Sequence, residues 1–226
     1  MTMVNANNNN GWPTVASQVK YCVNQFSQLF FDRVLLFFVS INDMSSSARR
    51  RRALLVVDMT VEQLDDIPLS ERQRLLHAVS TLITSLDWGW IVDARLWIEP
   101  HQTTSLAWLY PNVGIANTSG AELHESLRSL NKELTHIAKT HYSAFFENDL
   151  DEQLRARGID DVYICGIHTN YCVASTAMAS FERRYHTIVV GDACASAGGD
   201  EAHNVGLACV ERYVGSGAVV TLQNLL

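Results

Sequence analysis

The sequence contains no pair of cysteines spaced as CxxC and no excess of positive charge. Its five cysteines are scattered and odd in number, which is typical of free thiols in a reducing compartment and not of a disulfide framework or a zinc site. Lys and Arg total 17 against 24 Asp and Glu, a formal net charge of −7. This balance argues against general binding to nucleic acid or to an anionic membrane surface.

A hydrophobic run long enough to span a membrane is also missing. The most apolar stretch, residues 29–41, is interrupted by Asp32 and Arg33 and falls short of the roughly 20 residues that a spanning helix needs. No small-residue cleavage site clearly follows it, so a secretory signal peptide is not indicated. We therefore expect a cytoplasmic protein with no membrane partner, and leave open secretion by a route without a signal peptide.

The first 50 residues differ in composition from the rest. They begin with the low-complexity run NANNNN, which we expect to be disordered, and residues 17–41 carry an apolar stripe at helical spacing. We interpret residues 1–50 as a partly disordered N-terminal extension with an apolar helical segment. Residues 51–226 are long enough to form one α/β domain with a full core.

From residue 53 onward, strand-like and helix-like patterns alternate without an internal repeat. Short β-branched and apolar runs predict six strands, at residues 53–58, 89–94, 135–139, 161–165, 187–192 and 217–222. Helical patterns lie at residues 70–86, 121–130, 147–157, 170–181 and 200–213. This alternation predicts a doubly wound, Rossmann-like α/β fold, a parallel sheet of about six strands in a single three-layer domain.

Three of these strands lead directly to residues that can carry out chemistry. Asp58 follows the first strand, Lys139 ends the third, and Cys172 follows the turn after the fourth. Because the carboxyl ends of parallel strands share one edge of a sheet, we expect the three side chains to meet there. Taken singly, each has a plainer interpretation: a structural cap, a surface strand end and a buried structural cysteine.

Cys172 is expected in the first turn of a helix capped by Thr169 or Asn170. A thiol there lies at the positive end of the helix dipole, which lowers its pKa and favours the nucleophilic thiolate. Asp58 can accept the thiol proton, and Lys139 can stabilise both anions. The backbone N–H groups of His168 and Cys172 can then form an oxyanion hole.

Five motifs resemble those of the isochorismatase-like cysteine hydrolases, a group that includes nicotinamidases, N-carbamoylsarcosine amidase, ureidoacrylate amidase and isochorismatase. They are ALLVVDM at 53–59, SGAEL at 119–123, KTHYSAF at 139–145, GIHTNYCVASTAMAS at 166–180 and VVGDACAS at 189–196. The resemblance covers roughly residues 53–222 and implies that Asp58, Lys139 and Cys172 form a catalytic triad. It also implies a cis peptide bond between Ile167 and His168.

The resemblance further implies a reaction and an assembly. The thiolate attacks a small carboxamide, ammonia or an amine leaves, and the thioester is hydrolysed. The expected partners are a small-molecule substrate and further copies of the chain, in a homo-oligomer that is a dimer or a tetramer. Trp97, Tyr142 and Tyr171 are candidate substrate-binding residues. DMTVEQLDD places Thr60 and Gln63 where the family often has a glutamine and aromatic residues, so one wall of the pocket is expected to differ.

The nicotinamidases of this group hold a metal with an Asp-x-His pair and a further histidine. Here Arg95 replaces the first histidine after Asp93, and His101 is left alone. Since arginine stays protonated, it cannot act as a ligand. We therefore expect no metal and no other cofactor, which argues against nicotinamide as the substrate.

Three other functions stay open at this point. An isochorismatase would hydrolyse the vinyl ether of isochorismate to a 2,3-dihydrodiol acid and pyruvate, with Arg95 as a candidate for binding carboxylates. A non-catalytic interaction module would have no need of all three triad residues. A redox-sensing thiol would need Cys165 or Cys194 as a resolving partner.

Overall fold

The structure, a computed structural model, describes residues 50–226. The predicted N-terminal extension, residues 1–50, lies outside the described residues except for Arg50. None of the helices in the described range is long and apolar enough to cross a membrane.

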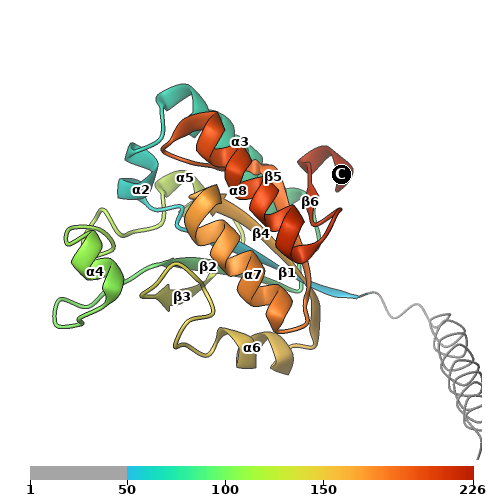
Figure 1. Cartoon of the computed structure of the whole chain (residues 1–226), viewed down its shortest axis with the longest axis horizontal. Coiled ribbons are helices and arrows are strands. Elements are labelled where there is room, and N and C mark those ends of the chain that lie inside the picture. The colour runs from blue at the N-terminus through green and yellow to red at the C-terminus, as the bar shows by residue number, and fades with distance from the viewer. Residues whose placement is uncertain (1–49) are drawn as a thin grey trace, which may run out of the picture. The chain divides into compact units, whose positions relative to one another are not determined.

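Six strands form one sheet in the order β3-β2-β1-β4-β5-β6, and every neighbouring pair is parallel (Figure 1). Their bounds are β1 Arg51–Val57, β2 Trp90–Leu96, β3 Thr135–Lys139, β4 Ile159–Ile167, β5 His186–Ala195 and β6 Val219–Val220. The predicted doubly wound parallel sheet is therefore confirmed. Residues 53–57 of β1 are fully buried, because this central strand is covered on both faces.

Helices cover both faces of the sheet. They are α2 Val61–Asp65, α3 Leu69–Ser85, α4 Ser105–Leu109, α5 Glu125–Arg128, α6 Leu150–Ala156, α7 Ala174–Glu182 and α8 Gly199–Val214, with a π-helical turn η1 Thr169–Val173 and a 3-10 turn η2 Leu222–Asn224. In Figure 1, α7 and α8 lie in front of the sheet and α3 lies behind it. These three layers match the predicted architecture.

The helix predicted at residues 121–130 is reduced to the four residues of α5. The segment before it bonds through its backbone to the chain that follows β1. Val61 N–H donates to the carbonyl of Glu122, Glu62 N–H donates to that of Gly120, and Thr60 bridges to Leu123. These bonds hold residues 120–123 as a turn and a bend that end in the bridge at Leu123, where the sequence pattern predicts the start of the helix.

The fourth strand does not end at Gly166, as its sequence indicates, but continues to Ile167. Gly166 has a φ of 114° and lies so close to β1 that a Cβ atom would fall 2.1 Å from the carbonyl oxygen of Val57. Only glycine combines this backbone conformation with this approach. The residue that reads as a strand breaker therefore brings the ends of β1 and β4 together.

The direction of winding reverses between these two strands. From β1 the chain adds β2 and β3 on one side, and from β4 it adds β5 and β6 on the other. Ligand sites of open parallel sheets lie at such a switch point, outside the carboxyl ends of the strands. The segments that carry Asp58 and His168 both leave the sheet there.

Candidate active site

Asp58 is the first residue after β1 and is anchored to the neighbouring strand. Its backbone has a φ of 50°, a left-handed conformation that aspartate adopts more readily than most residues. Its N–H donates to the carbonyl of Ala94 at 3.0 Å, and its Oδ1 accepts from the N–H of Leu96 at 2.8 Å. The second oxygen, Oδ2, is left to face the other site residues.

Lys139 brings its ammonium to that oxygen from two strands away. It is the last residue of β3 and is fully buried. Its Nζ lies 2.7 Å from Asp58 Oδ2, and it donates to Cys172 Sγ at 3.4 Å and to the carbonyl of His141 at 3.1 Å. The structure therefore brings the three expected triad residues together around one ammonium group.

Cys172 is positioned by a wide turn and not by an ordinary helix start. The expected cap at Thr169 or Asn170 is wrong: His168 precedes the turn, and Val173 N–H donates back to the His168 carbonyl at 3.2 Å. Thr169 and Asn170 lie inside η1 and fasten it to the surrounding structure. The Thr169 hydroxyl bonds to Nδ1 of His203 on α8 at 2.8 Å, and Asn170 Oδ1 accepts from the Ser196 hydroxyl at 2.8 Å.

The peptide bond between Ile167 and His168 is cis, as the resemblance implies. It joins the end of β4 to η1. Gly206 of α8 packs against the same turn, where a Cβ atom would lie 2.6 Å from the backbone of Thr169 and Asn170. The position of Cys172 therefore depends on close contact between η1 and α8.

The pKa of Cys172 is raised to about 12, opposite to the sequence-based expectation. Burial is the largest cause, because it disfavours the charged thiolate. The Asp58 carboxylate raises the pKa further, while the Lys139 ammonium lowers it without compensating. The resting group is therefore a neutral thiol beside a carboxylate, and its proton has an acceptor at hand.

The pKa of Lys139 is raised despite complete burial. Burial alone would lower it, but the charges and hydrogen bonds of Asp58 and Cys172 outweigh that effect. The ammonium therefore keeps its charge next to both groups.

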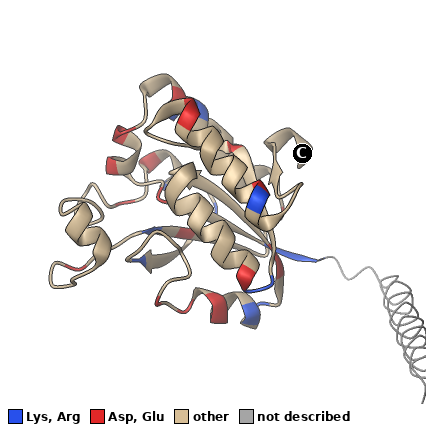
Figure 2. Ribbon diagram, in the orientation of Figure 1, with Lys and Arg blue, Asp and Glu red and all other residues tan. Residues whose placement is uncertain are grey.

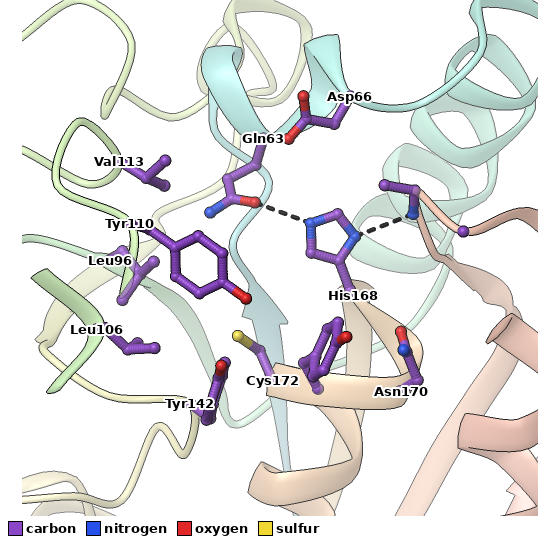
Figure 3. Close-up of a pocket in the computed structure, with 13 residues that line it drawn as sticks. Gln63, Asp66, Leu96, Leu106, Tyr110, Val113, Tyr142, His168, Asn170 and Cys172 are labelled. Carbon is purple, nitrogen blue, oxygen red and sulfur yellow. Dashed lines mark hydrogen bonds between the residues drawn. The ribbon is translucent and has the colours of Figure 1, made fainter. Parts of the chain in front are cut away.

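A cavity of about 230 Å³ opens above Cys172 (Figure 3). It is lined by Gln63, Asp66, Leu96, Leu106, Tyr110, Val113, Tyr142, His168, Asn170, Tyr171, Cys172, Ala197 and Gly198. Two of the three predicted substrate-binding residues, Tyr142 and Tyr171, are part of this wall. Trp97 is not; its ring packs edge-on against His136 at 5.2 Å and beneath the Arg95 guanidinium at 5.0 Å.

One wall of the cavity is aromatic. The rings of Tyr142 and Tyr171 stack with their centroids 5.7 Å apart. Burial and a hydrogen bond with Tyr110 raise the pKa of Tyr142 to about 12, so its phenol stays protonated. Tyr110, Leu106 and Val113 come from the segment between β2 and β3. Long connections inside a compact domain are often functional, but no residue pattern in this one indicates which of its side chains face the site.

The opposite wall contains His168 and Gln63, which are bonded to each other; His168 was a candidate for the pocket lining from the sequence, but its pairing with Gln63 was not predicted. His168 Nδ1 accepts from the backbone N–H of Ala197 at 3.1 Å, so the proton of the neutral ring lies on Nε2 and is donated to Gln63 Oε1 at 3.0 Å (Figure 3). Burial lowers the pKa of His168, which favours this neutral ring. Gln63 was noted only as a departure from the family pattern.

Asp93 and Arg95, considered for metal and carboxylate binding, pair with each other. Their charged groups are 3.4 Å apart, and Arg95 also lies 3.3 Å from Glu122. Burial raises the pKa of Asp93 to about 7 in spite of Arg95. His101 is exposed in the following loop, and within residues 50–226 no group of three or more His, Cys, Asp and Glu side chains is arranged to hold a metal ion.

Solved structures of known proteins share this fold. A nicotinamidase from Bacillus subtilis matches 76% of this chain and 99% of its own with a TM-score of 0.64 and 24% identity. An isochorismatase-like hydrolase from Alkaliphilus metalliredigens matches 77% of this chain and 96% of its own, with a TM-score of 0.61 and 24% identity. At this identity the likeness concerns the fold.

Relatives of higher identity match a shorter segment. The ureidoacrylate amidohydrolase RutB of Methylobacterium radiotolerans is 42% identical over 79 residues, which is 35% of this chain and 31% of the relative. The isochorismatase family protein YddQ of Bacillus subtilis, which is uncharacterized, is 40% identical over 80 residues, or 35% of this chain and 44% of the relative. The matched segment thus spans less than half of these relatives. The isochorismatase domain, by contrast, matches residues 52–223, and the chain therefore belongs to the isochorismatase family.

Proposed function

We propose that this protein is a cysteine hydrolase that cleaves the C–N bond of a small carboxamide. The observation that carries the proposal is the buried Lys139 ammonium, 2.7 Å from Asp58 and 3.4 Å from Cys172, beside an open cavity. A binding module or a structural cysteine has no need of a buried carboxylate–ammonium pair next to a thiol, since taking two charges out of water is costly. The amidohydrolase among the relatives supports the same reaction class.

In the first half of the reaction, Asp58 takes the proton of Cys172 as Sγ attacks the carbonyl carbon of the substrate. The carbonyl oxygen becomes an oxyanion, which the backbone N–H groups of His168 and Cys172 stabilise. Lys139 stays protonated and balances the negative charge that moves between carboxylate and sulfur. Asp58 then returns the proton to the nitrogen as the C–N bond breaks, which releases ammonia or an amine and leaves a thioester on Cys172.

In the second half, a water molecule replaces the amine. Asp58 accepts a proton from it while the hydroxide adds to the thioester carbonyl. The C–S bond breaks, the sulfur recovers its proton from Asp58, and the carboxylic acid leaves. One water is consumed for each C–N bond cleaved, and the enzyme returns to its starting state.

Hydrolysis of isochorismate finds less support in this cavity. That substrate carries two carboxylates, and the lining residues include neither lysine nor arginine. Arg95, the cation considered for this role, is paired with Asp93 and Glu122 and is not part of the lining.

The test is release of ammonia from a panel of small primary carboxamides, with isochorismate and a pyruvate assay in parallel. Cys172→Ala should abolish turnover and leave the melting temperature close to that of the wild type. Cys209→Ala is the matched control, because Cys209 is exposed on α8 and lies outside the cavity lining. A substrate-derived mass on the Cys172 peptide after rapid quenching would support the thioester. Turnover that survives Cys172→Ala, or pyruvate as the product, would contradict the proposal.

A further inference from the structure

The side chain of Gln63 faces the cavity, and the proposed reaction gives it no role. Its residue is 7% exposed, and its oxygen is used by His168 Nε2–H at 3.0 Å. Within the described part of the chain, its amide nitrogen Nε2 has no hydrogen-bond partner. In Figure 3 this nitrogen points away from His168, toward the side of the cavity that carries Tyr110 and Val113.

The orientation of this amide is fixed by a chain of bonds. Ala197 N–H donates to His168 Nδ1, so His168 must donate from Nε2, and the group that accepts must be the oxygen of Gln63. The amide cannot flip without placing its NH₂ against a ring N–H. Its two hydrogen atoms are therefore held toward the cavity.

The helix that carries Gln63 is also held in place. The Thr60 hydroxyl caps α2 by accepting from Gln63 N–H at 3.4 Å. The next residue toward the N-terminus, Glu62, accepts from Gly114 N–H at 2.6 Å, which ties α2 to the loop that carries Tyr110 and Val113. A donor on so rigid a support is preorganised, and a ligand pays little entropy to use it.

The charges around the cavity limit what this donor can bind. Asp66 is the only Asp, Glu, Lys or Arg side chain among the lining residues, and it is exposed at the edge. The whole segment of residues 97–124, which supplies α4 and the adjoining wall, contains no lysine or arginine (Figure 2). A carboxylate on the substrate would therefore meet no counter-charge and would face Asp66.

We infer that Gln63 is a specificity residue that donates a hydrogen bond to a neutral acceptor on the substrate, and that the substrate is an uncharged carboxamide with an apolar or aromatic body. The body packs between the tyrosine wall and Leu96, Leu106 and Val113. A carbonyl, ether or ring nitrogen remote from the reacting amide accepts from Gln63 Nε2. This inference rests on the proposed function, because it takes the carboxamide to be the group presented to Cys172.

The experiment measures binding separately from turnover. Calorimetric titrations use the full chain with Cys172→Ser, and the probes are benzamide, the three pyridinecarboxamide isomers and 3-carbamoylbenzoate. The isomers differ from benzamide by one ring acceptor, and 3-carbamoylbenzoate adds a carboxylate. We expect at least one pyridine isomer to bind about tenfold more tightly than benzamide, the worth of one well-placed hydrogen bond, and the anion to bind more weakly than benzamide.

Two substitutions in the same background test the residue itself. Gln63→Met removes both polar atoms at similar length, and Gln63→Glu keeps an oxygen for His168 Nε2–H but replaces the NH₂ donor with a second oxygen. Both variants should bind the preferred pyridinecarboxamide isomer and benzamide with nearly equal affinity. Because Gln63→Glu keeps the bond to His168, its loss of preference is attributable to the missing donor. Melting temperatures of both variants check the fold.

Each outcome decides the inference. It is overturned if the preference survives both substitutions, if 3-carbamoylbenzoate binds most tightly, or if none of the five amides binds. Ammonia release by the protein with Cys172 intact reports on the proposed function alone. A Gln63-dependent preference without ammonia release would remove the proposed reaction and leave the recognition assignment standing.

Discussion

Asp58 and Lys139 form an ion pair that is buried almost completely, so each residue depends on the other. Lys139→Met leaves an uncompensated carboxylate in the core and should reduce the free energy of unfolding by about 3–5 kcal/mol. The double substitution Asp58→Asn with Lys139→Met removes both charges and should recover most of that loss. Urea denaturation measures all three proteins.

Activity should not follow stability in this series. If Asp58 and Lys139 take part in the reaction, the double variant stays inactive while its unfolding midpoint returns toward that of the wild type. A double variant that regains both would assign the pair a purely structural role.

The thiol of Cys172 gives a prediction with a definite sign. With a pKa of about 12, only about one thiol in ten thousand is ionised at pH 8, and the rate of alkylation should rise about tenfold per pH unit below that pKa. Because the Asp58 charge raises the pKa, Asp58→Asn should lower it and speed alkylation, even though this variant cannot turn over substrate. Lys139→Met should have the opposite effect on alkylation.

Iodoacetamide labelling between pH 7 and 10, with the Cys172 peptide quantified by mass spectrometry, measures these rates. A wild-type rate that is already constant at neutral pH would instead indicate a stable thiolate–ammonium pair. The sequence predicted the thiolate, because the pattern reveals the start of a helix but neither the burial of Cys172 nor the Asp58 carboxylate beside it. Burial and the nearby carboxylate arise only when segments far apart in the sequence pack together.

At the scale of elements, the contact between α8 and η1 positions the nucleophile. Gly206→Ala would place a Cβ atom 2.6 Å from the backbone of Thr169 and Asn170, so η1 or α8 must shift. We expect turnover to fall more than stability, because the substitution also improves helix propensity by up to about 1 kcal/mol. Asn204→Ala, at an exposed site on the same helix, is the control for propensity.

Steady-state kinetics together with thermal melting separates the two effects. If Gly206→Ala keeps full turnover and gains stability as Asn204→Ala does, the turn can accommodate the added methyl group, and the close packing is not needed for activity.

The elements differ in how well the sequence foretold them. The strands and the long helices α3 and α8 follow clear periodic patterns, and their existence was predicted correctly. The short pieces were not: α5 is cut to four residues by the backbone bonds of residues 120–123, and α2 and α4 were not anticipated. Such segments take their shape from partners far along the chain, which a local pattern cannot contain.

The same limit applies to the site. Asp58, Lys139 and Cys172 could be found because each follows or ends a recognisable strand or strand–helix turn. Tyr110 and Gln63 lie on loops and single-turn helices, so their direction depends on contacts such as Glu62 with Gly114. Trp97 was chosen for its aromatic ring, but Arg95 and His136 hold that ring outside the cavity lining.

At the scale of the whole molecule, the described residues 50–226 include a six-stranded sheet, a buried core and the residues that line the candidate site. We predict that a chain that starts at Arg50 keeps the melting temperature and turnover of the full chain. A chain that starts at Met59 lacks β1 and Asp58, and should not fold, because the sheet loses its fully buried central strand. Circular dichroism and the ammonia assay compare the three proteins.

If the chain from Arg50 is folded but inactive, or aggregates, the prediction is wrong. The N-terminal residues then contribute to function or to assembly. Analytical ultracentrifugation of both lengths would show whether the predicted dimer or tetramer forms, and whether residues 1–49 take part in it.

Strand β2 lies between β3 and β1 and contributes no reacting group, yet it sets the distance between Lys139 at the end of β3 and Asp58 after β1. Leu96 pairs with Lys139 across the sheet and donates its N–H to Asp58. An insertion or deletion of one residue in this strand would turn alternate side chains to the opposite face and break that register. The loops after β2 bear no such constraint. Changes in those loops could therefore alter which amide is accepted, while β2 keeps Asp58 and Lys139 at the same distance.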